Sequence, residues 1–221
     1  KNGLDYLVVT GDENIEEDFK LDEKNHSLIV KEKDTYEGLP YKVVKTFYTI
    51  NKIFNYNFIV KSDDDCIINA RKLIENKDKY KGEDYIGRLN NFENTYNPNW
   101  NGLKNRSKYY GPYMNGGTGY ILSKGALKTI ATSTKKNTEF LKDELYEDKL
   151  IGDILRINGI KFKKHDTWNS IPIESNKIEN YEEFLNKNNN IQFMTFYGPQ
   201  WVYIFIFFYL INLIYQCSFI Y

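Results

Sequence analysis

The sequence predicts an α/β fold with a mainly parallel central sheet and flanking helices. Short apolar segments that end at glycine or polar residues alternate with segments whose apolar residues recur at helical spacing. The length of 221 residues suits one such domain with a substantial core. One apolar segment is followed, after a lysine and a serine, by three acidic residues, at the position where strands of an α/β sheet present ligand-binding groups.

The expected strands are short runs of mostly β-branched or aromatic residues. The clearest covers residues 6–10 (YLVVT), and Gly11 and Asp12 terminate it. Further expected strands cover residues 27–30, 58–60, 85–87 and 120–122. Their alternation with helices indicates one largely parallel sheet.

The expected helices have apolar faces and recognisable ends. In residues 42–54, apolar residues at spacings of three and four form one face. Ser123 is a good N-cap for a helix over residues 124–130. A helix over residues 144–158 ends at Gly159, a residue type that often closes helices. The remaining segments are a short helix over 70–76 and an Asn-rich loop over 90–108.

The charge balance argues against a nucleic-acid-binding protein. The chain has 30 basic and 30 acidic residues and therefore no net charge, whereas affinity for nucleic acid depends on a positive surface. Its two cysteines, Cys66 and Cys217, lie far apart in the sequence. They indicate free thiols rather than a disulfide scaffold or a zinc site.

The two ends of the sequence are unusual. The chain begins with Lys1 rather than Met and has no signal-like segment, so we expect a fragment or an excised domain. From Trp201 onward, 21 residues contain no charge, which is long enough to span a bilayer. The aromatic and β-branched content of this tail also fits buried strands. Membrane association through the tail and a strand structure are both left open.

The acidic residues lie within the stretch FIVKSDDDCIIN, residues 58–69. Adjacent carboxylates repel one another, and a strand rarely tolerates that without a reason. In an extended chain alternate residues extend to the same side, which favours Asp63 and Asp65 as a pair. A hard cation such as Mn²⁺ or Mg²⁺ prefers such oxygen ligands and leaves positions for phosphates. A solvated acidic turn is the alternative, but the apolar flanks argue against it.

Four segments resemble, in order, the motifs of the β-1,3-galactosyltransferase family (glycosyltransferase family 31), which includes β-1,3-N-acetylglucosaminyltransferases and is related to Fringe. DTYEGLPYK from Asp34 resembles DTYxNLTxKT, and KSDDDCIIN from Lys61 resembles KTDDDxFVN. YGPYMNGGTGYILS from Tyr110 resembles YPPYxxGxGYVLS, and EDKLIG from Glu147 resembles EDVYVG. Each match is weak alone, but all four in family order between about residues 5 and 165 are specific.

The resemblance implies a glycosyltransferase-A (Rossmann-like) fold and a metal-dependent, inverting reaction. Galactose or N-acetylglucosamine would move from a UDP-sugar to a hydroxyl of a glycan or glycoprotein acceptor in β-1,3 linkage, with Mn²⁺ or Mg²⁺ as cofactor. The expected location is a Golgi or other secretory-pathway membrane, with the catalytic domain in the lumen. Residues 1–198 would form that domain, without the family's first strand–helix unit, and residues 199–221 the apolar tail.

The resemblance also implies roles for individual residues. Asp148 matches the family's catalytic base, and Asp63 and Asp65 match residues that serve the metal, with Asp65 as the expected direct ligand. The residues expected to bind the sugar nucleotide and its cofactor are Asp63, Asp64, Lys42, Gly116, Gly117 and Glu147. The two glycines permit the close backbone approach that a ligand-lining loop needs.

The residues around Asp148 support its role independently. Asp148, Ile151 and Leu155 lie at i, i+3 and i+7, so Asp148 shares a helix face with apolar residues. The more polar side of the helix would carry Lys149, Asp153 and Arg156. An inverting displacement needs one carboxylate placed to take the proton of the attacking hydroxyl. An acid that only stabilises the helix dipole is the alternative.

One departure from the family motifs favours a second function. Family members carry a His near the C-terminus that completes the metal site, but residues 194–199 (MTFYGP) contain none, and His165 is expected to be a surface residue. The alternative function is therefore a catalytically degenerate module that binds UDP-sugar or metal without turnover. A calcium-binding structural domain is a weaker alternative, because the loop pattern of an EF-hand is absent.

Overall fold

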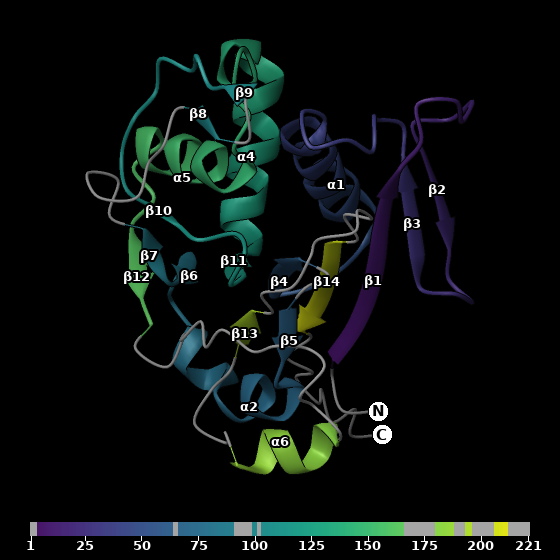
Figure 1. The fold of residues 1–221 in the computed structure, drawn as a ribbon, viewed down its shortest axis with the longest axis vertical. Coiled ribbons are helices and arrows are strands. Elements are labelled where there is room, and N and C mark those ends of the chain that lie inside the picture. Colours follow the sequence, from purple (N-terminus) through teal and green to yellow (C-terminus); the bar gives the residue numbers. More distant parts are fainter. Residues whose placement is uncertain are drawn as a thin grey trace, which may run out of the picture.

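An eight-stranded sheet forms the centre of the protein (Figure 1). The computed structural model describes residues 4–63, 66–90, 99–100, 103–165, 180–187, 193–195 and 206–211. The strand order is β12-β6-β11-β4-β14-β1-β3-β2. The strands are β1 (Leu4–Gly11), β2 (Phe19–Asp22), β3 (Ser27–Val30), β4 (Phe58–Asp63), β6 (Tyr85–Gly87), β11 (Tyr120–Ser123), β12 (Phe162–Lys164) and β14 (Ile206–Ile211).

The α/β class is confirmed, but the sheet is mixed rather than mainly parallel. Only β1–β3 and β6–β12 pair in parallel among the described neighbours of this sheet, and the other five pairs are antiparallel. The expectation was wrong because an apolar run looks the same in both directions. The direction depends on where each connection returns to the sheet, which local sequence does not encode.

The strand directions bring three loops to one edge of the sheet. β14 lies antiparallel to both β1 and β4, so β1, β3 and β4 all run the same way. β11 runs against β4, and therefore the start of β11 meets the end of β4. This edge consequently carries the loop after β3, the acidic end of β4, and the glycine-rich loop before β11.

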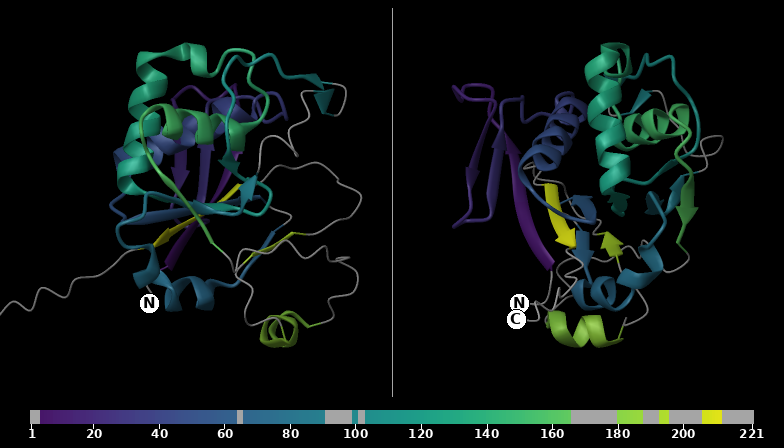
Figure 2. Two further views of the ribbon diagram at one scale, coloured as in Figure 1. Left: turned by 90° about the vertical axis from the view of Figure 1, so that its left-hand side faces the viewer. Right: turned by 180° about the vertical axis from the view of Figure 1, so that it is seen from behind.

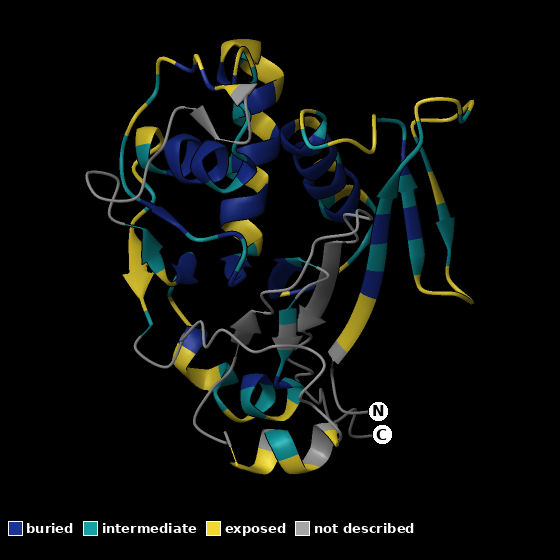
Figure 3. Cartoon of the chain, viewed as in Figure 1, coloured by how far each residue is buried: buried dark blue, intermediate teal, exposed yellow. Residues whose placement is uncertain are grey.

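Three helices cover one face of the sheet: α1 (Leu39–Ile53), α4 (Lys124–Lys136) and α5 (Glu147–Ile157). They contact one another and form one helical layer (Figures 1 and 2). Their inward faces are buried (Figure 3), and Val43, Phe47 and Ile50 of α1 are fully inaccessible to solvent. Together with Ile59 and Leu122 of the sheet they belong to the main hydrophobic core.

The opposite face carries a smaller core. Phe58, Val60 and Ile121 point to this side, and Leu73 of α2 (Ala70–Glu75) and Tyr80 of η1 (Lys77–Tyr80) pack against them. The alternation of Phe58, Ile59 and Val60 between the two cores follows from the two-residue repeat of a strand. The other elements are β5 (Cys66–Ile68) paired with β13 (Phe193–Thr195), β7 (Leu89–Asn90) with β10 (Tyr113–Met114), β8 (Asn99–Trp100) with β9 (Leu103–Lys104), η2 (Thr138–Phe140) and α6 (Tyr181–Lys187).

Most expected elements are present, with shifted ends. Ser123 caps α4 as expected, and its side chain accepts a hydrogen bond from the N–H of Ala126. Gly159 follows α5 with φ of +75°. The N–H of Ile160 then bonds to the carbonyl of Leu155, which satisfies an otherwise unpaired group at the helix end. The expected loop 90–108 contains the short hairpin of β8 and β9.

The apolar tail contributes a central strand. β14 pairs residue by residue with both β1 and β4, from Ile206 to Ile211. For this part of the tail the strand alternative holds, while residues 199–205 and 212–221 lie outside the described part of the chain. Among the described helices, none has both the length and the apolar character needed to cross a membrane.

Candidate active site

Asp148 lies in the first turn of α5, at the sheet edge that carries the three loops. Its Oδ2 accepts a hydrogen bond from the backbone N–H of Gly116 at 2.9 Å, and its Oδ1 accepts one from the N–H of Lys149 at 2.8 Å. Burial of the carboxyl group, followed by the negative charge of Glu147, raises the pKa of Asp148 to about 7. A carboxylate with a pKa near neutrality is well suited to act as a general base.

Glu147 is buried beside Asp148 and binds two side chains of the sheet. Nζ of Lys61 donates a hydrogen bond to its Oε1, and the hydroxyl of Tyr120 donates to its Oε2 at 3.0 Å. Only 4% of Glu147 and none of Lys61 is exposed to solvent. Burial raises the pKa of Glu147, whereas the positive charge of Lys61 opposes that effect. Both carboxylate oxygens of Glu147 therefore bind side chains of the protein itself. Its expected contact with a sugar nucleotide stays a prediction.

Lys61 connects Glu147, the neighbour of Asp148, to the acidic run. Its Nζ also donates to Oδ1 of Asp63 at 2.6 Å. Burial lowers the pKa of Lys61, but Asp63 and Glu147 raise it further than burial lowers it, so the ammonium group stays charged. Lys61 thus places a positive charge against Asp63, the first residue of the acidic run. This role of Lys61 could not be predicted from local sequence, because Glu147 lies 86 residues further along the chain.

The register of β4 and β11 explains how these side chains meet. Tyr120 lies directly opposite Lys61 across the two strands, so both side chains stand on the face that α5 covers. Nζ of Lys61 lies 5.6 Å from the centre of the Tyr120 ring. Asp63 is two residues beyond Lys61 and therefore extends to the same face. The cross-strand pair holds Glu147, and Glu147 fixes the first turn of α5.

The glycine-rich loop lies so close to Glu147 and Asp148 that there is no space for a side chain at Gly116. A Cβ at Gly116 would lie 2.5 Å from Oε1 of Glu147 and 2.9 Å from Cβ of Asp148. At Gly117 the nearest atom would be 3.6 Å away, an ordinary contact. The carbonyl of Gly117 accepts a hydrogen bond from Sγ of Cys66 at 2.7 Å, which ties the loop to β5. The expected ligand-binding roles of both glycines stay predictions.

Of the remaining expected binding residues, Lys42 has its hydrogen-bond partner away from Asp148, and two aspartates lie outside the described part of the chain. Lys42 is fully buried on α1, and its Nζ binds Asp34 in the loop after β3. The other carboxylate oxygen of Asp34 accepts a hydrogen bond from the N–H of Gly11 at 3.2 Å. Asp64 and Asp65 are not among the described residues. Asp63 is therefore the expected metal ligand whose position is known.

The described residues contain no cluster of three or more His, Cys, Asp or Glu side chains arranged to hold a metal ion. Asp63 keeps about a quarter of its side chain exposed, 26%, although it binds Lys61. A carboxylate oxygen at this sheet edge is a suitable donor for a hard cation. His165 instead lies beside Tyr80, with ring centroids 6.4 Å apart, at the smaller core.

The side of α5 that was expected to be polar is buried as well. Nζ of Lys149 donates to Oε2 of Glu144 and to Oδ2 of Asp153, both at 2.7 Å, and all three residues are at most 3% exposed. Oε1 of Glu144 accepts hydrogen bonds from the N–H groups of Leu145 and Tyr146. This network fixes the backbone that leads into α5, and hence the position of Asp148.

The fold and the site together define an α/β protein with a carboxylate-based candidate active site, built where a strand, a glycine-rich loop and a helix N-terminus meet. The chain belongs to the galactosyltransferase family, whose model matches residues 7–166. The four motifs identified in the sequence lie inside this match. Membership in this family supports the assignment of the protein as a hexosyltransferase.

Two curated relatives carry the same name. The chain is 28% identical over 139 residues to UDP-GalNAc:beta-1,3-N-acetylgalactosaminyltransferase 2 of Xenopus laevis, a match that covers 61% of this chain and 28% of the relative. It is 27% identical over 123 residues to the Xenopus tropicalis protein of that name, covering 54% of this chain and 24% of the relative. The matched region thus spans about a quarter of the length of these relatives.

Proposed function

We propose that the protein is an inverting glycosyltransferase with a glycosyltransferase-A fold, which transfers galactose or an N-acetylhexosamine from a UDP-sugar to a glycan hydroxyl in β-1,3 linkage. The observation that carries this proposal is Asp148: a carboxylate with a pKa of about 7, fixed by two backbone hydrogen bonds beside the acidic end of β4. Family membership supports the reaction class, and the names of the two relatives support N-acetylgalactosamine as one donor sugar.

In the proposed reaction Asp148 removes the proton of the acceptor hydroxyl while its oxygen attacks the anomeric carbon. A new bond forms between that oxygen and the anomeric carbon, the bond from the anomeric carbon to the diphosphate oxygen breaks, and UDP leaves with the electron pair. Glu147 does not compete for the proton, because Lys61 and Tyr120 already occupy its two oxygens. Lys61 also places positive charge beneath the site.

Asp63 and Asp65 would hold a divalent cation, Mn²⁺ or Mg²⁺. Such an ion, when bound, neutralises negative charge on the departing diphosphate. The exposed part of Asp63 supports this assignment. The acceptor would be a glycan or glycoprotein, and a secretory-pathway membrane with a lumenal catalytic domain is the proposed location, by analogy with the family.

The test is release of UDP with Mn²⁺ present, using UDP-galactose, UDP-N-acetylglucosamine and UDP-N-acetylgalactosamine in turn with a panel of sugar acceptors. We expect turnover with at least one pair, its loss in excess EDTA, and its restoration by Mn²⁺. Asp148→Asn should lower kcat by about 100- to 10,000-fold, as loss of a general base does, without loss of UDP binding. Equal rates for wild type and Asp148→Asn would refute the catalytic assignment.

A degenerate binding module is the second candidate function. The ion pair between Lys61 and Asp63 favours it, because a carboxylate already paired with a buried lysine is a weaker metal ligand. This candidate predicts that calorimetry detects binding of UDP in the presence of Mn²⁺ while no acceptor panel gives turnover. Detectable sugar transfer would rule it out.

A further inference from the structure

Two tripeptides of the sequence have the form that accepts asparagine-linked glycans. Residues 25–27 (NHS) and 105–107 (NRS) read Asn-x-Ser, and no other asparagine of the chain has Ser or Thr two positions later. Cells attach a bulky glycan to such an asparagine in the secretory pathway, and the modified residue lies on the surface of the folded protein. The structure places Asn25 and Asn105 in opposite environments, so it distinguishes the two.

Asn105 is buried, and both ends of its amide are hydrogen-bonded. Only 3% of the residue is exposed. Its Nδ2 donates to Oε1 of Glu144, within the network that leads into α5, and its Oδ1 accepts a hydrogen bond from the N–H of Ser107 at 3.0 Å. A sugar linked to Nδ2 has no space in this position. A chain glycosylated here before folding could not bury Asn105, and therefore the folded protein carries no glycan at this residue.

Asn25 is exposed in the turn between β2 and β3. Its Nδ2 donates to Oδ2 of Asp22 at 2.7 Å, and its backbone N–H donates to Oδ1 of the same residue at 3.1 Å. The next residue, His26, has φ of +51° and stacks on Tyr6, with ring centroids 4.5 Å apart. An amide nitrogen has two hydrogens, so a sugar can replace one while the other keeps the bond to Asp22. The folded turn is thus compatible with a glycan.

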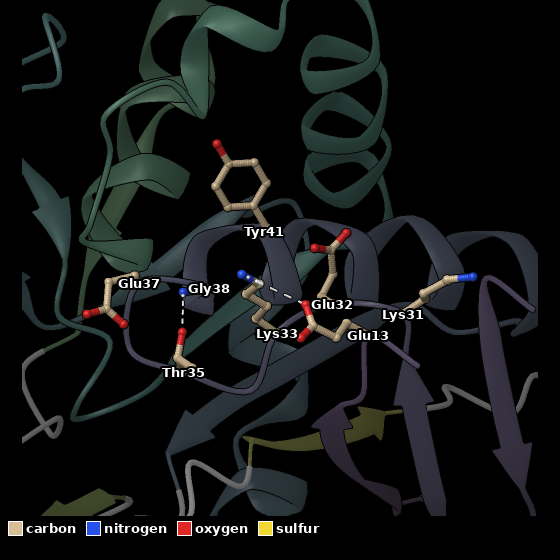
Figure 4. Close-up of a pocket in the computed structure, with 8 residues that line it drawn as sticks. All are labelled: Glu13, Lys31, Glu32, Lys33, Thr35, Glu37, Gly38 and Tyr41. Atoms are coloured by element: carbon tan, nitrogen blue, oxygen red, sulfur yellow. Dashed lines mark hydrogen bonds and ion pairs between the residues drawn. The ribbon is translucent and has the colours of Figure 1, made fainter. Parts of the chain in front are cut away.

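A glycan at Asn25 leaves the candidate active site open. The turn precedes β3, whereas the active-site edge lies beyond the other end of that strand. That edge also carries an open cavity of about 490 Å³, lined by residues that follow β1 and β3, such as Glu13 and Lys31, and by the first turn of α1 (Figure 4). The length of β3 therefore separates the modified residue from both the cavity and Asp148.

We infer that Asn25 is a site of N-linked glycosylation and that Asn105 is not. This inference rests on the lumenal location within the proposed function, because the glycan donor is an oligosaccharide on a lipid diphosphate in that compartment. During the transfer, a bond forms between Nδ2 of Asn25 and C1 of the first sugar, and the bond from C1 to the diphosphate oxygen breaks. The lipid diphosphate leaves with the electron pair, and Nδ2 loses one proton.

The test directs the full chain into the secretory pathway of a eukaryotic cell with a cleavable signal peptide. Folded protein, isolated by size-exclusion chromatography, is treated with peptide N-glycosidase in water labelled with heavy oxygen. The enzyme converts a glycosylated asparagine to a labelled aspartate, which mass spectrometry locates. We expect the label at position 25 and none at position 105, together with a single shift in gel mobility on treatment.

Four variants make the assignment specific. Asn25→Gln and Ser27→Ala should each abolish the mobility shift, whereas Ser27→Thr should keep it, because Thr also completes the tripeptide. Asn14→Gln is the matched control: Asn14 is exposed and bonds to Asp12 in a similar turn, but Glu16 lies two positions later. This control should keep the shift.

Folded wild-type protein without a glycan at Asn25, or with one at Asn105, would overturn the inference. Sugar transfer by the protein is measured on the same samples, and it does not influence this result, because attachment of the glycan uses the cell's own transferase. Absence of sugar transfer by a protein glycosylated at Asn25 would therefore refute the proposed activity and leave the glycosylation site intact. Sugar transfer by a protein without a glycan would do the reverse.

Discussion

Gly116 donates its backbone N–H to Oδ2 of Asp148 at 2.9 Å, and the same glycine has no space for a side chain. The hydrogen bond orients the carboxylate of Asp148, and the close approach allows the loop before β11 to lie directly on the first turn of α5. One residue thus couples the glycine-rich motif to the acidic helix motif, although they are 32 residues apart in the sequence.

Replacing Gly116 by alanine should therefore destabilise the protein by about 1–3 kcal/mol, the usual cost of forcing extra volume into a packed region. The new Cβ would meet Oε1 of Glu147 and Cβ of Asp148 at distances that real contacts do not reach. The measurement is urea unfolding monitored by circular dichroism. Gly117→Ala is the matched control, with an expected change within about 0.5 kcal/mol. Equal stability of the two variants would contradict the geometry.

The pH dependence of kcat/KM should show an acid limb with a midpoint near pH 7. Burial and the charge of Glu147 raise the pKa of Asp148 from 3.8 to about 7, so the carboxyl is protonated, and inactive as a base, below that pH. Activity should rise tenfold per pH unit below the midpoint and level off above it. Buffers from pH 5.5 to 8.5 cover the range, and UDP release is the readout. A flat profile across this range would show that another group accepts the proton.

The candidate site was predictable where its signals are local in the sequence. The helix carrying Asp148, its position on an apolar face and the N-cap Ser123 all follow from residues within a few positions of one another. The family motifs assign roles that spacing alone cannot, and these roles stay predictions. Asp65 stays a prediction, because it lies outside the described residues.

The parts that could not be predicted involve partners far apart in the chain. Lys61 ends an apolar run and looks like the beginning of a loop, but Glu147 and Tyr120 arrive from distant elements to bury it. The direction of a strand in the sheet likewise depends on neighbours from distant parts of the chain, such as β14 between β1 and β4. Lys149 and Asp153 were expected on the polar side of α5, but they are buried in a network with Glu144.

Removing the charge of Lys61 should be strongly destabilising. Lys61→Met leaves Glu147 buried without its cation, and breaking a buried ion pair in this way typically costs about 3–5 kcal/mol. Lys45→Met is the matched control: Lys45 contacts Asp18 and Glu32 at 3.4 and 3.7 Å, in a more exposed setting, and should change stability by at most about 1 kcal/mol. Urea unfolding of both variants gives the comparison.

The double variant Lys61→Met with Glu147→Gln distinguishes charge from packing. If the cost of Lys61→Met comes from the unpaired carboxylate, then neutralising Glu147 should restore part of the lost stability. Gln can still accept the hydrogen bond from the hydroxyl of Tyr120. A double variant less stable than Lys61→Met alone would show that the contacts of the two side chains, rather than their charges, stabilise this part of the fold.

Lys149 should affect activity through the position of α5 rather than through contact with substrate. Its ammonium lies between Glu144 and Asp153, and Glu144 in turn binds the two N–H groups that precede the helix. Lys149→Met leaves Glu144 without a cation, although Arg156 still pairs with Asp153 at 2.8 Å. We expect a loss of about 3 kcal/mol or more in the free energy of unfolding.

At a temperature where Lys149→Met is still folded, we expect a lower kcat with little change in the KM for the donor, because Asp148 is less well placed while the proposed donor site at the end of β4 is intact. Lys128→Met, on the exposed side of α4, is the control and should change neither stability nor kcat. If kcat of the folded Lys149→Met protein equals that of wild type, then the buried network stabilises α5 without positioning its base.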